Sequence, residues 1–402
     1  MIDRESAVKF DISCSLKVLV EALKFANVFA PTRPSHPILS GVLLKAENNS
    51  LTIETCDLSQ GCKITIPATV NKANSTVVPC KELLSLLSNF VGDTIDIFLT
   101  ESTGKTESIL ASSTDYDYDL ALQLGNQNAF VATFPPTEYP NIFDIQSTHS
   151  LTLDTEQLIQ VLERTSYTAS KDDTKQVLCG LNLSTKSSGL TFAGTNGHYL
   201  AVGCIEGNYD PSLSVTVPVS FWGRLQKLLK DVDSVSFAID DRAIQANLTA
   251  ILAKEFLVEV CLHTRILEGT YPRFDKLIPT DFTREVKASR QELLQALGLI
   301  GVCVTESTAS AETCVFDIKE DEILISKSGV AIKTVSQVVK SEMLLGEPII
   351  IGLNHVYFRN ILNSLGSNEV IIYLNEVNNP IIVKAVDESM ESLALLMPVQ
   401  LR

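Results

Sequence analysis

The sequence lacks the features of a secreted, disulfide-bonded or membrane-spanning protein. Its nine cysteines are an odd number, are scattered over 402 residues and include no CxxC pair, which favours reduced thiols over a disulfide framework. No apolar run approaches the length of about 18 residues that a membrane-spanning helix needs. The first ten residues carry charge and no apolar core, so no signal peptide is visible. These absences predict a cytoplasmic protein without membrane association.

Motifs for catalysis are also missing. No GxSxG, Walker-type loop or HExxH occurs, and the five histidines are dispersed without an evident partner. Asp115, Asp117 and Asp119 alternate with tyrosines, so on a strand their carboxylates share one face. Such a face could bind a divalent cation and serve a metal-dependent nuclease, although a solvated acidic strand face is commoner. We therefore expect no enzymatic activity and no metal or cofactor.

The dominant feature that is present is a long internal repeat. The order strand, helix, several strands, helix, several strands occurs three times, with a period of roughly 130 residues. Proline-containing breaks at residues 134–140 and 268–272 separate the three rounds. The pattern predicts an α+β fold with antiparallel sheets on the outside and two helices per repeat on the inside. We expect domains at residues 1–145, 146–281 and 282–402.

Residues 194–202, Gly-Thr-Asn-Gly-His-Tyr-Leu-Ala-Val, lie at the centre of the chain between two strand-like runs. The Asn-Gly pair predicts a hairpin in which both central residues of the turn have positive φ. His198 has no second ligand at suitable spacing, so a metal site is not expected there. A strand rather than a helix follows, which argues against a phosphate-binding loop. The turn instead presents His198, Tyr199 and Leu200 to a neighbouring segment.

Charge is unevenly distributed. The net charge of −16, taken alone, argues against a nucleic-acid partner. However, nine bases and only five acids occur in the six expected helices, at residues 15–28, 80–90, 155–167, 220–230, 290–302 and 354–365. This excess fits either six ordinary solvated helix faces or one shared surface that faces a polyanion. Arg224, Lys227 and Lys230, spaced by three residues without an intervening acid, favour the second interpretation most strongly.

Four stretches resemble the bacterial DNA polymerase III beta subunit family, the sliding clamps. They are His-Pro-Ile-Leu-Ser-Gly at 36–41, Thr-Asn-Gly-His-Tyr-Leu-Ala-Val at 195–202, Glu-Gly-Thr-Tyr-Pro at 268–272 and Leu-Met-Pro-Val-Gln-Leu at 396–401. The motif order and the threefold repeat match over essentially the whole chain. The resemblance implies a non-catalytic processivity factor, whose three-domain protomer closes head-to-tail with a second copy into a ring around double-stranded DNA. A ring-shaped scaffold that does not bind DNA is the alternative.

The resemblance also implies sites and partners. A few phosphate-neutralising bases would suit a ring that slides, and the expected ones are Arg33, Lys81, Lys175, Arg224, Lys227 and Lys230. The expected partners are the clamp loader, the replicative DNA polymerase and other proteins that carry a clamp-binding peptide. Apolar anchors of that peptide would enter a groove lined by Leu178, Thr195, Gly197, His198, Leu200, Pro272, Leu277, Asn354, Tyr357, Leu396, Met397 and Pro398.

The chain departs from the family pattern at some positions. Tyr199 and Gln400 stand where clamps often carry basic residues, so a DNA contact at Tyr199 is not expected. By resemblance, residues 116–122 would form a sheet edge that pairs with the region around Cys303 and Val304 of a second copy. We therefore expect a homodimer of twice 43.9 kDa.

Overall fold

The computed structural model describes residues 9–31, 33–101, 118–186, 188–210, 212–302, 312–328, 333–387 and 390–401. The chain forms two compact units: unit 1 is Met1–Thr155 with Gly223–Ile266, and unit 2 is Glu156–Trp222 with Leu267–Arg402. Asp115, Asp117, Cys303 and Val304, on which two expectations depended, lie outside the described residues. Among the described helices, none combines the length and the apolar character needed to cross a membrane.

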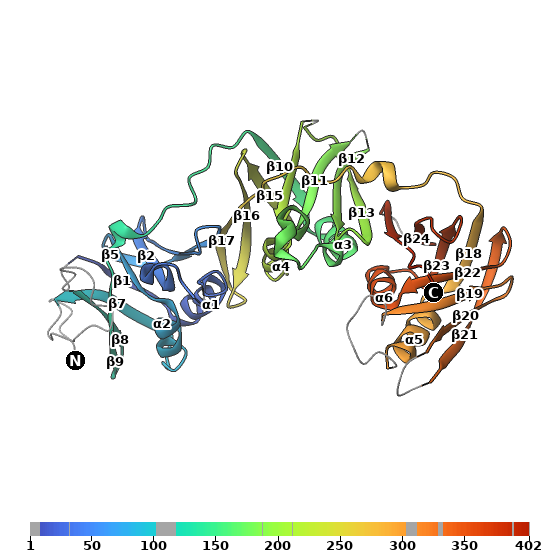
Figure 1. Ribbon diagram of the computed structural model, residues 1–402. Helices are drawn as coiled ribbons and strands as arrows, with labels where there is room; N and C mark the ends of the chain where they lie inside the picture. The colour runs from blue at the N-terminus through green and yellow to red at the C-terminus, as the bar shows by residue number, and fades with distance from the viewer. Residues whose placement is uncertain are drawn as a thin grey trace. The chain divides into compact units, whose positions relative to one another are not determined.

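One order of elements occurs three times along the chain, with an additional strand, β5, in the first copy (Figure 1). The first copy contains β1 (Asp11–Ser15), α1 (Leu16–Ala26), β2 (Gly41–Glu47), β3 (Ser50–Cys56), β4 (Gln60–Pro67), β5 (Thr69–Lys72), β6 (Asn74–Pro79), α2 (Cys80–Leu87), β7 (Thr94–Glu101), β8 (Tyr118–Leu124) and β9 (Gln127–Ala132). The second contains β10 (His149–Asp154), α3 (Thr155–Thr165), β11 (Gly180–Lys186), β12 (Gly189–Thr195), β13 (Tyr199–Glu206), β14 (Ser214–Pro218), α4 (Val219–Gln226), β15 (Ser234–Ile239), β16 (Ala243–Leu252) and β17 (Phe256–Arg265). The third contains β18 (Arg284–Ser289), α5 (Arg290–Gly301), β19 (Thr313–Ile318), β20 (Glu322–Lys327), β21 (Val335–Leu345), β22 (Ile349–Asn354), α6 (His355–Ser364), β23 (Glu369–Leu374), β24 (Ile381–Ala385) and β25 (Ser392–Leu396).

Strand pairing repeats together with the element order. In each copy the first strand pairs with the strand after the second helix, as β1–β7, β10–β15 and β18–β23. Each copy also has four strands in the same spatial order, as β6-β2-β3-β4, β14-β11-β12-β13 and β22-β19-β20-β21. All of these pairs are antiparallel. The expected α+β fold of three repeated units is therefore confirmed.

The copies are joined by continuation of their sheets. The last strand of the second copy, β17, pairs with β4 of the first, placing Cys261 opposite Lys63. The last strand of the third copy, β25, pairs with β13 of the second, placing Leu396 opposite Tyr199. At both joints the last strand of one copy meets the end strand, β4 or β13, of the four-strand group in the copy before. We call these pairings the β17–β4 joint and the β25–β13 joint.

The prediction that residues 116–122 form a sheet edge is wrong for residues 118–122, which are the part of this range that the structure describes. Strand β8 pairs with β7 on one side and with β9 on the other, so β8 is an inner strand. The edge strand is β9. The pattern of apolar residues did not separate the two, because both strands are short and apolar.

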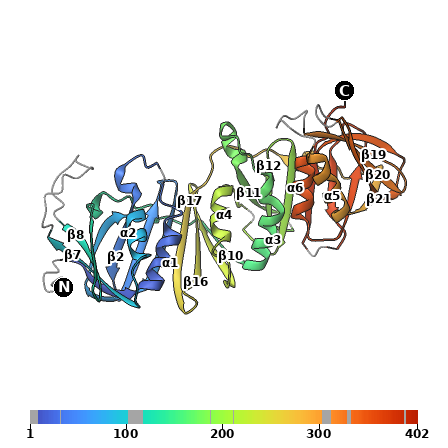
Figure 2. The ribbon, with the colours of Figure 1, turned by 90° about the horizontal axis from the view of Figure 1, so that it is seen from below.

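Helices cover the sheets through their apolar faces. In the first copy α1 packs on β3 and β4; in the third, α5 packs on β20, β21 and α6 (Figure 2). All six expected helices are present at their expected places. However, α4 ends at Gln226, because the N–H groups of Leu228 and Leu229 bond to carbonyls three residues back, in a tighter turn. Lys227 and Lys230 therefore follow the helix instead of lying on it.

The segment between the first and second copies is anchored at several points in unit 1. The Tyr139 hydroxyl accepts the N–H of Cys56 at 3.1 Å and donates to the Glu54 carbonyl at 3.2 Å. Ile142 lies over Gly61, where an added Cβ would come within 2.6 Å of the Ile142 Cδ1. Because Gly61 has no side chain, this segment has space to cross the β17–β4 joint.

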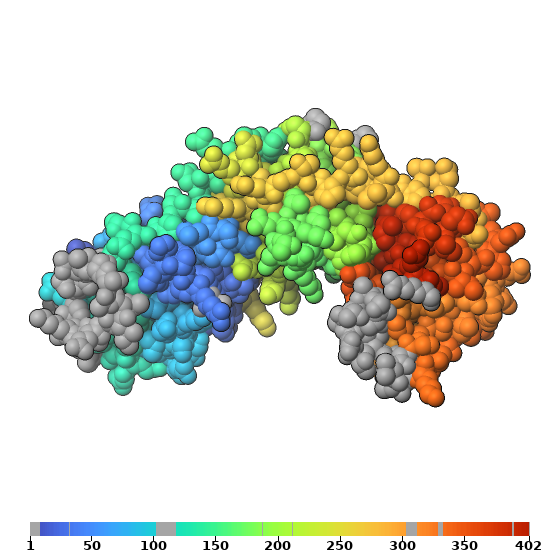
Figure 3. Space-filling view, viewed as in Figure 1, coloured from blue at the N-terminus to red at the C-terminus, as the bar shows by residue number. Residues whose placement is uncertain are grey.

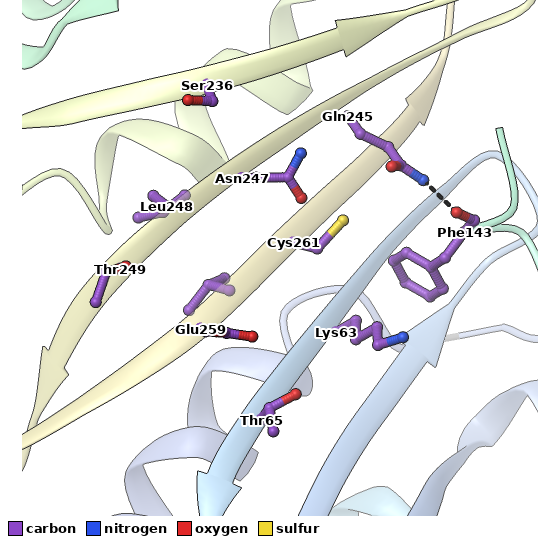
Figure 4. A pocket seen from close by; sticks show the side chains of 11 residues that line it. Lys63, Thr65, Phe143, Ser236, Gln245, Asn247, Leu248, Thr249, Glu259 and Cys261 are labelled. Atoms are coloured by element: carbon purple, nitrogen blue, oxygen red, sulfur yellow. Dashed lines mark hydrogen bonds between the residues drawn. The ribbon is translucent and has the colours of Figure 1, made fainter. Parts of the chain in front are cut away.

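Phe143 continues this anchoring (Figure 4). Its carbonyl accepts a hydrogen bond of 2.6 Å from Gln245 Nε2, and its ring meets the His263 ring edge-on at 6.0 Å. Burial lowers the pKa of His263 to about 4, so its imidazole is neutral at pH 7. A polar cavity of about 500 Å³ lies beside Phe143, with Lys63 and Cys261 in its wall. The segment thus covers one end of the β17–β4 joint, and the cavity lies next to the covered part.

We predict that Tyr139→Phe weakens unit 1 locally. The buried N–H of Cys56 would lose its acceptor, and an unsatisfied buried donor costs about 1–3 kcal/mol. Amide hydrogen exchange should therefore speed up in peptides that cover residues 51–56, and the thermal midpoint should fall. Tyr373→Phe is a suitable control, because no hydrogen bond to its hydroxyl is seen among the described residues. Equal exchange in the wild type and Tyr139→Phe would contradict the anchoring role.

Candidate functional site

The hairpin between β12 and β13 forms the first part of the site. Gly197 has φ +92°, whereas Asn196 stays outside the left-handed region, so the expectation of two positive φ angles is wrong. The Asn196 Oδ1 instead accepts the N–H groups of His198 at 2.9 Å and Tyr199 at 3.2 Å. The Thr195 hydroxyl donates to the Tyr199 carbonyl at 2.7 Å. Side-chain hydrogen bonds therefore fix this turn, and Thr195 is committed to it.

The C-terminal segment runs directly past this turn. The Met397 N–H donates to the His198 carbonyl at 2.9 Å, and the Val399 N–H donates to the Gly352 carbonyl at 2.8 Å. A Cβ at Gly352 would lie 2.3 Å from the Val399 carbonyl oxygen, so only glycine permits this approach. Met397 is 40% exposed, while the preceding Leu396 is fully buried. The segment thus presents Met397 beside His198.

Three aromatic rings meet at the same place. The Tyr199 and Tyr357 rings stack with centroids 4.4 Å apart and planes 12° apart. The His198 ring lies nearly parallel to that of Tyr357, at 6.1 Å and 16°. Tyr357 is half-buried and His198 is exposed. His198, Tyr357 and Met397, which are far apart in sequence, therefore form one partly exposed surface.

Asn354 supports this surface from beneath. Its Oδ1 accepts the N–H groups of Val356 at 2.9 Å and Tyr357 at 3.2 Å, which caps α6. Its Nδ2 donates to Glu312 Oε2 at 2.9 Å, and the residue is only 4% exposed. The Asn354 amide thus makes its hydrogen bonds within the protein. The exposed polar side chain of this surface is that of His198. Sequence spacing gave no sign of this capping role.

A second group of expected residues lies on the other side of β13. Leu200 is buried against Phe274 and Leu395, beneath the connector of residues 267–282. Figure 3 shows the yellow-to-orange surface of this connector next to the green surface of the second copy. On the connector, Pro272 is exposed and Leu277 is 61% exposed. Burial raises the pKa of the neighbouring Tyr271.

The twelve expected groove residues all lie in unit 2, and they divide by exposure. Buried ones support the site: Thr195, Leu200, Asn354 and Leu396. Exposed or half-buried ones form what we call the peptide surface: Leu178, Gly197, His198, Pro272, Leu277, Tyr357, Met397 and Pro398. The spacing of these residues in the sequence gives no sign of this division.

The expected DNA-contacting bases also differ from one another. Arg33, Lys81, Lys175, Lys227 and Lys230 are exposed. The guanidinium of Arg224 is half-buried: it donates to Gln60 Oε1 at 2.9 Å and lies 4.7 Å from the centre of the Phe29 ring. Burial lowers its pKa, but an arginine remains charged. Arg224 therefore links α4 to the first copy, a role that the spacing of the three bases did not indicate.

Three α+β copies joined strand to strand define the class of DNA sliding clamps. Family models agree along the chain: the DNA polymerase III beta subunit N-terminal domain matches residues 10–142, the central domain 152–273 and the C-terminal domain 275–400. The chain belongs to the bacterial DNA polymerase III beta subunit family.

Individual relatives support this assignment. The beta sliding clamp of Synechococcus elongatus is 28% identical over 400 residues, covering 97% of this chain and 99% of the relative. That of Chlamydia muridarum is 24% identical and covers 94% and 95%. A solved C. crescentus beta sliding clamp shares the fold, with a TM-score of 0.86 at 18% identity over 98% and 99% of the chains. A Pseudomonas aeruginosa clamp bound to griselimycin has a TM-score of 0.83 at 19% identity over 98% and 100%.

The chain therefore functions as a DNA sliding clamp, a processivity factor of DNA replication that acts with double-stranded DNA and a DNA polymerase. The clamp family is non-catalytic, which confirms that the chain is not an enzyme. Within the described part of the chain, no group of three or more His, Cys, Asp or Glu residues is placed to hold a metal ion. Asp115 and Asp117 of the expected acidic face lie outside that part of the chain.

Proposed function

We propose that the peptide surface binds short linear peptides and so recruits the replicative polymerase, the clamp loader and other DNA-processing proteins in the cytoplasm. The observation that carries this proposal is the 40% exposed Met397, which lies beside the exposed His198 ring stacked on Tyr357. A second large apolar side chain, Leu277, is 61% exposed on the connector. Apolar anchoring with a few orienting polar groups is typical of peptide sites. Methionine repacks easily, which suits a surface shared by several partners.

Ligand-bound relatives provide a chemical probe. Solved clamps from Pseudomonas aeruginosa and Bartonella birtlesii are bound to griselimycin. We propose that griselimycin binds this chain at the peptide surface, in competition with partner peptides. We also propose domain boundaries after residues 145 and 281, close to the two proline-containing breaks.

Removal of residues 398–402 tests the peptide surface. The truncation removes Pro398 and the Val399–Gly352 hydrogen bond but leaves the β25–β13 joint paired. Each buried anchor is worth about 2 kcal/mol, so we expect at least about 30-fold weaker binding. The measurement is fluorescence anisotropy of a labelled clamp-binding peptide from the replicative polymerase, with griselimycin as competitor.

Gln400→Ala is the matched control, because Gln400 is exposed and lies outside the peptide surface. The truncated chain should stay folded by circular dichroism and dimeric by light scattering. Unchanged peptide affinity in the folded truncated chain would place the peptide site elsewhere.

For DNA, we propose that Arg33, Lys81, Lys175, Lys227 and Lys230 contact phosphates, while Arg224 mainly holds α4 in place. The lysines are exposed point charges, which attract phosphates without reading bases. Such contacts hold the duplex weakly and without sequence preference, as sliding requires.

Neutralising two of these bases tests their placement. The Lys227→Gln/Lys230→Gln variant should bind open duplex DNA more weakly, with a slope of log affinity against log salt that is smaller by about 1.8. Lys45→Gln/Lys319→Gln makes the same charge change at lysines paired with Glu47 and Glu322, and should alter the slope less. An equal slope in both variants would refute the assignment. Adding Arg224→Gln should further weaken binding and lower the thermal midpoint.

We propose a head-to-tail homodimer from the pattern of the joints. Each joint pairs the last strand of one copy with the end strand, β4 or β13, of the preceding four-strand group. Among the described residues, the two strands that lack such a partner are β9 and residues 335–340 of β21. Both expose an apolar side chain, Phe130 at 56% and Val338 at 51%. Unpaired apolar edges favour association, and two protomers would close both edges with two identical joints.

Phe130→Lys tests this assembly by placing a charge at the proposed joint. Light scattering should give twice 43.9 kDa for the wild type and 43.9 kDa for the variant. The control Leu257→Lys, at an exposed position in an already paired strand, should remain dimeric.

Encirclement of DNA is tested separately. The dimer loaded on circular DNA should be released from that DNA when the DNA is linearised. A wild-type monomer at micromolar concentration would contradict the dimer, and retention after linearisation would contradict encirclement.

A further inference from the structure

Tyr199 belongs to the central motif but has no part in the functions proposed above. It is only 4% exposed, so it cannot contact DNA or a bound peptide extensively. Its ring nevertheless stacks on that of Tyr357, with centroids 4.4 Å apart. We infer that Tyr199 is a positioning residue that fixes the Tyr357 ring and thereby sets the affinity of the peptide surface. This inference rests on the proposed peptide-binding function.

Tyr357 packs at the edge of the buried cluster to which Tyr199 belongs. The Asn354 cap holds the Tyr357 N–H at the start of α6, and the orientation of the half-buried ring depends on the side chains packed against it. Of the two rings nearly parallel to it, His198 is exposed on a turn and Tyr199 is buried. Tyr199 is therefore the one of the two that can hold the Tyr357 ring in a defined orientation.

Tyr199 is itself held by several segments of unit 2. Its hydroxyl donates to the Tyr167 carbonyl at 2.6 Å, and the centroid of the Tyr167 ring lies 5.8 Å from that of Tyr199. Burial raises the pKa of Tyr199 to about 12, so the hydroxyl keeps its proton at neutral pH. Its backbone lies opposite Leu396 in the β25–β13 joint. A side chain restrained from three directions can hold its neighbour within the tolerance that a binding site needs.

The simpler interpretation is that Tyr199 only fills the core. It does belong to the large buried cluster formed with α5, α6 and their strands. A filling role predicts that its replacement lowers stability and leaves peptide affinity unchanged wherever the protein stays folded. A positioning role predicts a loss of affinity that depends on Tyr357.

The test uses the full-length chain and the labelled polymerase peptide in anisotropy titrations. Tyr199→Leu keeps an apolar side chain but removes the ring, and should weaken peptide binding about fivefold, the scale of one aromatic pair. Tyr199→Phe keeps the ring and should restore affinity to within about twofold. If circular dichroism shows that the Leu variant is unfolded, Tyr199→Met takes its place, because methionine adapts to irregular space.

A double-mutant cycle gives the decisive comparison. In a Tyr357→Leu background, Tyr199→Leu should cause no further loss, because Tyr199 acts through Tyr357. An equal loss in both backgrounds, or no loss in the folded single variant, would overturn the positioning role. If Tyr357→Leu itself leaves affinity intact, the proposed peptide surface fails as well. If Tyr357→Leu weakens binding while Tyr199→Leu does not, only the present inference fails.

Discussion

Backbone pairing across the β25–β13 joint is the interaction on which the peptide surface depends. The ladder places Leu396 opposite Tyr199, and the next hydrogen bond ties Met397 to His198. Because side chains alternate between the faces of a strand, a slip of one residue would exchange the buried Leu396 with the exposed Met397. Register here is set by burial: Tyr199 faces the core beneath α6, and Leu200 faces the connector. The same ladder thus builds the fold and aligns the site.

The joint also explains why so many supporting residues are buried. Asn354 caps α6, Thr195 closes the hairpin, and Gly352 admits the C-terminal segment. None of them needs to touch a ligand to affect binding, because each fixes the backbone that carries an exposed neighbour. Preorganisation of this kind lowers the entropy that binding would otherwise cost. A surface made from three distant segments can therefore be precise without being large.

The sequence was sufficient to predict the threefold order, all six helices and the hairpin, since these follow from local periodicity and turn chemistry. It was not sufficient to identify the edge strand, because an apolar pattern indicates that a strand is buried but not which strand it pairs with. Strand β8 lies between β7 and β9, and β9 is the edge. Spacing likewise grouped Arg224 with Lys227 and Lys230, although Arg224 packs on Phe29. The resemblance implies a set of groove residues, which stays a prediction, and only the contacts separate its buried side chains from its exposed ones.

Charge within residues 224–230 shows how a chain with a net charge of −16 can suit a sliding function. The guanidinium of Arg224 would offer a planar fork for bidentate phosphate binding. In this chain the Arg224 guanidinium instead hydrogen-bonds to Gln60 and lies over the Phe29 ring. Lys227 and Lys230 remain exposed, and an ammonium group attracts phosphate without fixing one geometry. In the DNA contacts proposed above, committing the arginine to the fold and leaving Lys227 and Lys230 at the surface would give attraction without a tight, directional grip. A ring that must hold DNA and still move along it needs that combination.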